Sequence, residues 1–332
     1  MPFPEGVPIS AARLTIFPRR IFLSAPAIRA ALPSPGPIFP GRLPGGFTPS
    51  NGRKVKAGSS SRYRVSPRLS WGLAATLVVV VVSGLVLAYP YREAFPFLST
   101  LAIENVVPFG RLFRRIHYLS GLLFVVLLLW HGVEALLSES YQRRSWLRWT
   151  ALTATLPLGL LLAFTGYVAR GDETGRLAGY IAETLSLKIP FLGPLLNALF
   201  FGVREEGVHR AYLFHIYGTG ALLLLSGIWH FRLRRLPLED LLFWATLTLA
   251  AVPFLPLGLH GPGFHLLVKG PWFFVGIQEA LRHLPPRLAG IVFPALGPML
   301  YLGTKAWPRA CGRALLLWTL LYGGLTVVGL VR

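Results

Sequence analysis

The chain has 332 residues, of which 53% are hydrophobic and only 14% charged, and its formal net charge is +20. Because soluble domains carry about 25% charged residues, this composition excludes an ordinary soluble protein. The apolar residues come in long blocks, which also excludes a disordered or nucleic-acid-binding chain. No nucleic-acid partner is therefore expected, despite the positive charge.

Residues 1–65 form an extension rich in proline and arginine, with Glu5 as its one acid. The extension holds no apolar run long enough to cross a membrane. Segments of this composition bury too little apolar surface to fold alone. We therefore expect it to be poorly ordered or to lie against a partner.

Seven apolar segments follow, and each approaches the roughly 20 residues needed to cross about 30 Å of hydrocarbon. This pattern predicts an all-α, multi-pass membrane protein of about seven transmembrane helices in a lipid bilayer. The segments are 71–89, 112–137, 149–168, 211–233, 241–258, 287–303 and 313–331.

Two long connections separate some of these segments. Residues 169–210 contain two amphipathic stretches, 177–187 and 191–201, which are too short to cross and are expected to lie at the membrane interface. Residues 259–286 contain an aromatic cluster that includes Trp272, followed by a short helical pattern. Both connections fall on one side of the membrane, which indicates a site there.

Basic residues are dense beside alternate ends of the segments. They precede 71–89 and occupy the links after residues 137, 233 and 303, whereas most acids lie in the opposite loops. Lys and Arg accumulate on the cytoplasmic side of membrane proteins. We therefore expect the N-terminus to lie inside, and the protein to reside in a bacterial inner membrane.

Four histidines lie inside the second and fourth predicted spans, where this residue type is costly and usually functional. His117 and His131 are 14 residues apart in the second span. His215 and His230 are 15 residues apart in the fourth. At about 100° per residue, the members of each pair lie within ~40° or ~60° of the same face and roughly 21 or 22 Å apart along the axis. Because the two spans run in the same direction, His117 is expected to be level with His215. His131 is then level with His230.

Two facing histidine pairs at different depths suit two b-type haems, each held between neutral imidazoles from facing helices. Iron with two histidine ligands has no open position, which favours electron transfer over oxygen chemistry. Non-covalent binding is expected, because Cys311 is the single cysteine and no Cys-x-x-Cys-His motif attaches a c-type haem. Zinc is disfavoured, since each level offers only two ligands.

Two other interpretations stay open at this point. Membrane histidines can simply hydrogen-bond between helices, although four histidines at matched depths favour a shared cofactor role. A transporter that uses the histidines for protons or metal is the alternative from another class. It predicts discontinuous helices, whereas the two spans are unbroken between their histidines.

Four short motifs accompany the histidines: Arg114-Arg115-Ile116-His117, Arg210-Ala211-Tyr212-Leu213-Phe214-His215, Gly166-Tyr167-Val168 and Ile189-Pro190-Phe191-Leu192-Gly193. Together they resemble the cytochrome b family of the quinol:cytochrome c oxidoreductases over about residues 66–304. The gap of thirteen residues after His117 is that family's gap. The gap of fourteen after His215 resembles the variant in its chloroplast and cyanobacterial branch.

The resemblance implies the cytochrome b subunit of a quinone-linked respiratory or photosynthetic electron-transfer complex, which is not by itself a complete enzyme. Residues 66–236 would be a four-helix dihaem bundle, and residues 237–332 a three-helix region with an outer loop. Quinone is the implied substrate, and the implied partners are a Rieske-type iron–sulfur protein, a c-type cytochrome or both, in a homodimeric complex. Arg114 and Arg210 are placed to pair with haem propionates, or else simply extend to the interface.

One departure from the family pattern concerns the outer quinol site. The family's Pro-Glu-Trp-Tyr loop is Gly270-Pro271-Trp272-Phe273 here, so the tryptophan is present and the carboxylate is absent. Quinol oxidation needs a proton acceptor. Among the nearby Lys269, His265 and Glu279, His265 has the most suitable ordinary pKa, about 6.5. We expect this site to use Trp272 with His265, or to be vestigial.

A second departure is Glu134, three residues after His131, where the family often has an arginine. Glu134 is a candidate proton group at an inner quinone site, or else an interfacial acid satisfied by Arg143 or Arg144. The missing loop carboxylate also favours an alternative complex without a Rieske protein. In that complex a multihaem cytochrome c exchanges electrons with the haems.

Overall fold

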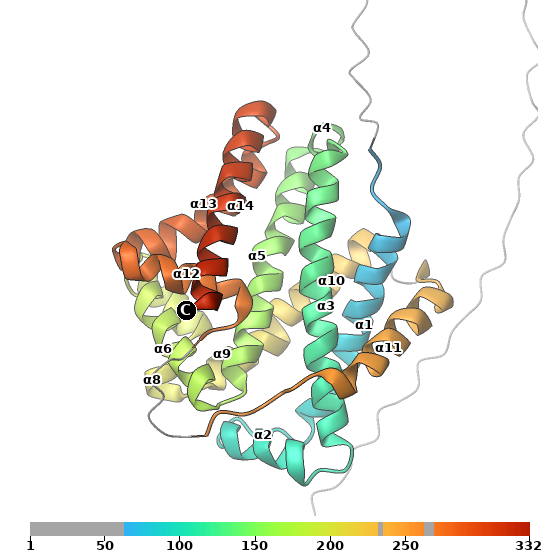
Figure 1. Ribbon diagram of the computed structural model, residues 1–332, viewed down its shortest axis with the longest axis vertical. Coiled ribbons are helices and arrows are strands. Elements are labelled where there is room, and N and C mark those ends of the chain that lie inside the picture. Colours follow the sequence, from blue (N-terminus) through green and yellow to red (C-terminus); the bar gives the residue numbers. More distant parts are fainter. Residues whose placement is uncertain (1–62, 232–234, 262–268) are drawn as a thin grey trace, which may run out of the picture. The chain divides into compact units, whose positions relative to one another are not determined.

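All regular secondary structure in the described part of the chain is helical (Figure 1). The computed structural model describes residues 63–231, 235–261 and 269–332, which all belong to one of the chain's two units, Gly58–Arg332. The prediction of an all-α protein is confirmed for these residues. The expected N-terminal extension lies almost entirely outside the described residues, and His265 lies outside them as well.

Five helices among the described residues are long and apolar enough to span a membrane. Each overlaps a predicted span, which confirms membrane-crossing helices. The fourth of them, which we call the fourth helix, joins three pieces without a break: α9 (His209–Leu213), the π-helical η1 (Phe214–Gly220) and α10 (Ala221–Phe231). The other four are α1 (Pro67–Ala88), α3 (Gly110–Leu137), α5 (Trp146–Ala169) and α14 (Pro308–Val331).

The two remaining predicted spans are shorter in the structure, so the expected count of seven is not established. α11 (Leu238–Ala251) gives way to a 3-10 turn, Val252–Phe254, where Pro253 lacks the N–H that a continuing helix would need. The π-helical η4 (Leu288–Val292) and α13 (Phe293–Gly303) form one apolar helix that is shorter than a typical span of roughly 20 residues.

Local capping fixes where two of the long helices begin. α1 starts where the Ser66 hydroxyl accepts a hydrogen bond from the Leu69 N–H and Pro67 supplies the first helical φ. α5 starts in the same way at Ser145, whose side chain accepts from the Arg148 N–H. Each cap contributes about 1 kcal/mol. Both starts are therefore determined by the local sequence.

Four of the long helices form a bundle. α1 contacts α3, α3 contacts α5, α5 contacts the fourth helix, and the fourth helix contacts α1. α3 and the fourth helix therefore face each other diagonally, with α1 and α5 on either side. Outside the bundle, α11 packs against α1, and α14 packs against α13 and α12 (Trp272–His283).

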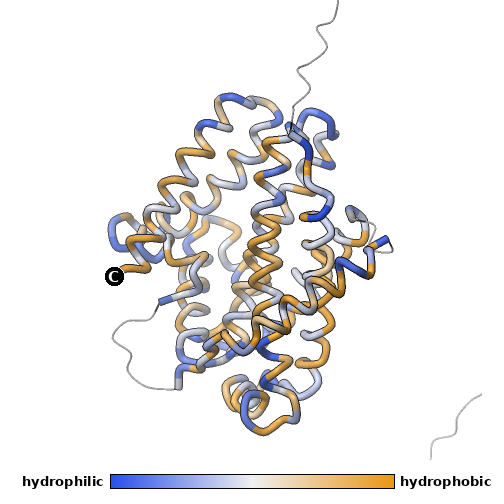
Figure 2. The backbone as a smooth tube through the Cα atoms, turned by 45° about the vertical axis from the view of Figure 1, so that its right-hand side comes forward, coloured by the Kyte–Doolittle hydropathy of each residue, from blue (hydrophilic) through white to orange (hydrophobic). Residues whose placement is uncertain are grey.

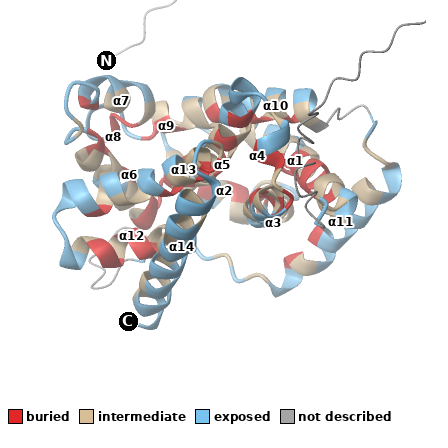
Figure 3. Cartoon of the chain, turned by 90° about the horizontal axis from the view of Figure 1, so that it is seen from above, coloured by how far each residue is buried: buried red, intermediate tan, exposed pale blue. Residues whose placement is uncertain are grey.

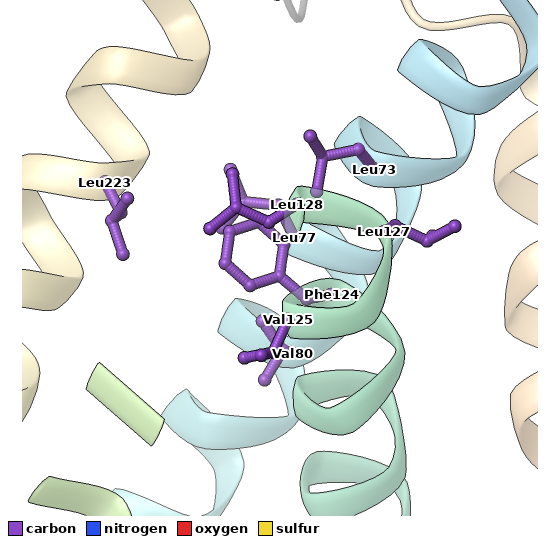
Figure 4. Close-up of a cluster of buried hydrophobic side chains, with 8 residues drawn as sticks. All are labelled: Leu73, Leu77, Val80, Phe124, Val125, Leu127, Leu128 and Leu223. Carbon is purple, nitrogen blue, oxygen red and sulfur yellow. The ribbon is translucent and has the colours of Figure 1, made fainter. Parts of the chain in front are cut away.

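A cluster of buried apolar side chains lies inside this bundle (Figure 4). Its α3 members lie between the two histidines of α3 in the sequence, and Leu223 faces them from α10, between the two histidines of the fourth helix. Because lipid is as apolar as these side chains, close packing rather than water exclusion holds them together. The cluster comprises Leu73, Leu77, Val80, Phe124, Val125, Leu127, Leu128 and Leu223.

Large apolar side chains are exposed on the long helices, as expected where helices meet lipid. The backbone of these helices is coloured largely as hydrophobic in Figure 2. α14 is the clearest case, since none of its residues is buried (Figure 3). Large side chains such as Leu317 and Leu320 are exposed on it. Composition and exposure together support a bilayer environment for this helix.

Shorter helices form the described connections. α6 (Glu173–Ser186) and α7 (Gly193–Phe200) match the two amphipathic stretches predicted between the third and fourth spans. α12 matches the helical pattern predicted after the aromatic cluster. The sequence analysis did not predict α2 (Pro96–Asn105), which packs against α3. The single-turn helices are α4 (Ser140–Arg143) and α8 (Val203–Glu206).

Candidate functional site

The structure brings the four membrane histidines together as two pairs. We call His117 and His215 the outer pair, and His131 and His230 the inner pair, after the orientation expected from the sequence. The ring centroids of the outer pair are 6.2 Å apart, with the ring planes at 74°. Those of the inner pair are also 6.2 Å apart, with the planes at 67°. The pairs join α3 to the fourth helix across the bundle interior, as their spacing in the sequence predicts.

The spacing of the rings fits one iron between each pair. Because a metal–nitrogen bond is about 2 Å long and the ring centre lies roughly 1 Å beyond the nitrogen, two imidazoles on opposite sides of one ion have centroids about 6 Å apart. Both observed separations, 6.2 Å, agree with this value. Within the described residues no group of three or more His, Cys, Asp or Glu side chains is placed to hold a metal ion, so two-histidine ligation is the geometry that these residues offer.

His117 is oriented by α1. Its Nδ1 lies 2.9 Å from the Val80 carbonyl oxygen and 3.3 Å from Ser83 Oγ. A ring nitrogen that donates to a carbonyl carries the proton, so the lone pair is left on Nε2, the nitrogen available to a metal. Gly84 packs against the ring, and a Cβ at this position would lie 2.8 Å from His117 Cε1.

His215 is oriented by α5 in the same manner. Its Nδ1 lies 3.0 Å from the Leu162 carbonyl oxygen and 3.2 Å from Thr165 Oγ1, and a Cβ at Gly166 would lie 2.8 Å from His215 Cε1. On both flanking helices the carbonyl is followed by a hydroxyl residue at the third position and a glycine at the fourth. The supporting role of these residues was not predicted from the sequence, where only Gly166 was noted, as part of a motif, although the repeated pattern was present.

The π-helical η1 accounts for the unequal histidine spacing on the two helices. A π segment accommodates an extra residue within a continuous helix. The 15 residues from His215 to His230 therefore behave as the 14 from His117 to His131, which removes most of the angular mismatch expected from a regular helix. Gly220 permits this close turn, because a Cβ there would lie 2.5 Å from the His215 carbonyl oxygen.

The inner pair opens onto a cavity of about 350 Å³, within the usual size range of ligand sites. His131 and His230 both line it, together with Trp149, Tyr301 and Arg144. Tyr301 stacks on Trp149 with centroids 5.1 Å apart and donates to the Gly132 carbonyl oxygen. α13, which carries Tyr301, therefore closes this part of the bundle.

The two arginines expected at the outer level are each paired with an acid. Arg114 Nη1 donates to Glu104 Oε2 over 2.6 Å, and both side chains are largely buried between α2 and α3. Arg210 Nε donates to Glu206 Oε2 over 2.8 Å, and its Nη1 donates to the Ala198 carbonyl oxygen. These ion pairs fix both arginines one turn or so before His117 and His215. The sequence analysis did not identify Glu104 or Glu206.

Glu134 is buried near the inner pair. Its carboxylate accepts hydrogen bonds from the Tyr63 hydroxyl at 3.0 Å and the Ser66 N–H at 3.1 Å. The hydrogen bond to Glu134 raises the pKa of the Tyr63 hydroxyl. Among the described residues neither Arg143 nor Arg144 forms an ion pair with Glu134, so the structure does not support the alternative in which one of them satisfies this acid.

Trp272 and Glu134 lie toward opposite ends of α5. Trp272 begins α12, directly after the 269–271 segment, and the Tyr167 hydroxyl near the end of α5 donates to the Lys269 carbonyl oxygen over 3.4 Å. The inner cavity near Glu134 is instead lined by Trp149, near the start of α5. The structure therefore separates the two candidate quinone-site groups.

Glu279, another acid considered near the outer loop, is already paired. Its carboxylate contacts Arg332 Nη1 at 2.9 Å and His283 Nε2 at 3.0 Å, and the side chain is buried between α12 and α14. The hydrogen bond with His283 and the nearby arginines lower the pKa of Glu279, despite the opposing effect of burial. These contacts favour a structural role in joining α12 to α14.

Asp172 ties the two outer connections together. It caps α6 through the Gly175 N–H and accepts hydrogen bonds from Arg170 Nη2 and the His260 N–H. Burial disfavours the ionised carboxylate, but Arg170 and the donated hydrogen bonds outweigh burial, so the pKa of Asp172 lies below its ordinary value of 3.8. Folding therefore stabilises the ionised form.

Asp172→Asn should destabilise the protein by about 1–3 kcal/mol at pH 7, because buried partners lose a charged acceptor. Since the pKa is lower in the folded state, the contribution of Asp172 is complete above pH 3.8 and is lost as the pH falls through the folded-state value. Thermal unfolding in detergent should show the gap between wild type and variant narrowing below about pH 4. A gap that stays constant to pH 3 would contradict this assignment.

Paired histidines on diagonal helices of a membrane-spanning bundle are typical of haem-binding membrane proteins. The sequence model of the family described as cytochrome b/b6/petB matches residues 63–252, and the chain belongs to this family. Membership of this family implies that the chain binds haem b and takes part in electron transport in a membrane-bound respiratory chain. The match includes all four histidines and ends within the turn after α11.

Individual relatives are moderately similar. The chain is 29% identical over 159 residues to cytochrome b6 of Heliomicrobium gestii, covering 46% of this chain and 75% of that protein. It is 30% identical over 156 residues to the cytochrome bc complex cytochrome b subunit of Chlorobaculum thiosulfatiphilum, covering 45% and 36%. A chain of the structure named "Hyperthermophilic respiratory Complex III" has the same fold, with a TM-score of 0.60, 19% identity, and coverage of 80% of this chain and 84% of that one.

Proposed function

We propose that this chain is the dihaem cytochrome b subunit of a quinone-linked electron-transfer complex. The observation that carries the proposal is the pair of equal histidine separations, 6.2 Å at each level. His117 and His215 would hold an outer haem b, and His131 and His230 an inner one. When bound, each haem accepts and releases one electron.

The residues around the outer histidines prepare the outer site for that task. The carbonyl oxygens of Val80 and Leu162 hold the outer imidazoles with Nε2 available, so the ligands need little reorientation. Buried side chains such as Phe124 and Leu128 keep water out of the layer between the levels. The axial distance between the levels is about 21 Å, from fourteen residues at 1.5 Å each.

Quinone chemistry would take place at one or both ends of the bundle. Oxidation of a quinol releases two electrons and two protons, so each active site needs a base within hydrogen-bond reach. At the outer end we propose Trp272 as a wall of the pocket and His265 as the base. At the inner end Glu134, buried beside the inner cavity, would exchange the proton.

The partners follow from the relatives. One match, 24% identical over 166 residues, is the menaquinol:cytochrome c reductase cytochrome b subunit of Geobacillus thermodenitrificans. By analogy we propose that this chain works in a homodimeric complex with a Rieske-type iron–sulfur protein, a c-type cytochrome or both. Basic residues in the links favour an N-terminus inside a bacterial inner membrane.

A complex without a Rieske protein is the second candidate. The sequence Gly270-Pro271-Trp272 places no titratable group where the family's loop has its glutamate, and this favours the alternative. In such a complex quinone reacts at the inner end, and a multihaem cytochrome c exchanges electrons with the outer haem. The histidine transporter is not favoured, because α3 and the fourth helix continue unbroken between their histidines and the chain belongs to the cytochrome b family.

Quinol-dependent haem reduction tests the proposed function. Membranes that contain the complex should show both haems reduced after addition of a quinol, and an inhibitor specific for an active quinone site should block the reduction. Haems that quinol cannot reduce, in membranes where dithionite reduces them, would contradict the proposal.

Pro271→Glu tests the outer site. A positioned general base typically contributes 10²–10⁴-fold, so restoring the carboxylate should raise the outer-inhibitor-sensitive rate of haem reduction by about tenfold or more. His265→Ala should lower the native outer rate, if that rate is measurable. Rapid native turnover that only an outer-site inhibitor blocks, and that His265→Ala leaves unchanged, would refute both the His265 role and a vestigial outer site.

A further inference from the structure

Arg144 is a positively charged residue in the lining of the inner cavity. It lies in extended conformation in the link between α4 and α5, and it lines the same cavity as His131 and His230. It is the only lysine or arginine among the described residues that line this cavity.

This charge has no acidic partner in the described part of the chain. None of the ion pairs there includes Arg144, whereas Arg114 and Arg210 at the outer level pair with Glu104 and Glu206. Glu134, the acid nearest in sequence to the inner pair, is engaged by Tyr63 and Ser66 instead. A partly buried guanidinium without an anion is unfavourable.

Two effects disfavour the charged form of Arg144. Burial, followed by the neighbouring Arg148 and Arg143, lowers the pKa of Arg144. An anion in the cavity would relieve both effects, since it would replace lost hydration and offset the like charges. The planar guanidinium can donate two parallel hydrogen bonds to one carboxylate.

We propose that Arg144 binds a propionate carboxylate of the inner haem, and that it sets the potential of that haem. This inference rests on the proposed function, because it requires a haem between His131 and His230. The position three residues after His131 holds Glu134 and so supplies no positive charge. Arg144 supplies the positive charge at the inner level instead.

Arg144→Gln provides the main test, with Arg143→Gln as the matched control. Arg143 is the adjacent residue, it is exposed, and it donates to the Ser138 carbonyl oxygen without lining the cavity. Loss of the charge at 144 should disfavour the reduced inner haem by about tenfold, which is a fall of about 59 mV for a one-electron couple. Spectroelectrochemical titration of the purified complex should show this shift for the inner haem only.

Arg144→Lys covers the case in which the glutamine variant fails to keep its inner haem. Lysine retains the charge without the forked geometry, so this variant should keep the inner haem with a smaller shift in potential than loss of the charge would cause. Equal shifts in Arg144→Gln and Arg143→Gln, or a shift of both haems together, would overturn the proposal. An effect on quinone reactivity without a change in potential would also overturn it, since the group bound by Arg144 would then be the quinone or a lipid phosphate.

The wild-type protein separates this inference from the proposed function. If the wild type lacks an inner haem, the proposed function itself fails. If the inner haem is present and its potential is insensitive to Arg144→Gln, only the role of Arg144 fails.

Discussion

Alanine in place of His131 or His230 should remove the inner haem and leave the outer haem bound. Each level has its own pair, with rings 6.2 Å apart, and the apolar cluster around Phe124 separates the levels. Loss of one ligand therefore cannot be compensated from the other level. The purified variants should contain one haem b per chain, with the redox and spectral properties of the outer haem.

His283→Ala is the matched control for these variants. His283 lies on α12, is half-exposed and pairs with Glu279, so its loss should leave both haems bound. Reciprocally, His117→Ala should remove the outer haem alone. If His131→Ala removed the outer haem and kept the inner one, the pairing of α3 with the fourth helix would be wrong.

Valine in place of Gly84 or Gly166 should reduce occupancy of the outer haem by at least about tenfold. A Cβ at either position would lie 2.8 Å from the Cε1 atom of its histidine ring, closer than packed atoms approach, so the ring must move. Displacement of the ring also breaks its hydrogen bond to the Val80 or Leu162 carbonyl, and a misplaced ligand binds metal poorly. Haem content and the outer-haem spectrum would measure the effect.

Gly323→Val separates this steric effect from the general cost of a β-branched residue in a helix. Gly323 lies in α14, and a Cβ there would have no other atom within 4 Å. The control should therefore keep both haems. Full outer-haem occupancy in Gly166→Val would show that the ring does not need this close contact.

The histidine levels could be predicted from the sequence because helical geometry converts spacing directly into depth and direction. The spacing of His117 and His131 needs only a regular helix. The spacing of His215 and His230 predicts a worse alignment than the structure has, because η1 inserts a π turn that simple periodicity cannot reveal. Gly220 is the local signal for it, but a glycine alone does not distinguish a π turn from ordinary close packing.

Several partners of charged side chains were harder to predict because they are distant in sequence, although Glu206 lies only four residues before its partner Arg210. Glu134 is bonded by Tyr63 and Ser66, about seventy residues away, and only the tertiary structure brings these groups together. Glu104 reaches Arg114 because α2 folds back against α3, and the sequence analysis did not include α2. The end of α11 at Ala251 has a local signal in Pro253, but the span predicted from the sequence continued past this proline to residue 258.

The number of haems per chain tests the central claim most directly. Pyridine haemochrome analysis of the purified protein, combined with quantitative amino-acid analysis, gives this ratio without assumptions about quinone or partners. Two histidine pairs predict two b-type haems per chain, both extractable with acidic acetone because no thioether bonds hold them. A ratio of one or zero in fully folded protein, or a haem that resists extraction, would contradict the account.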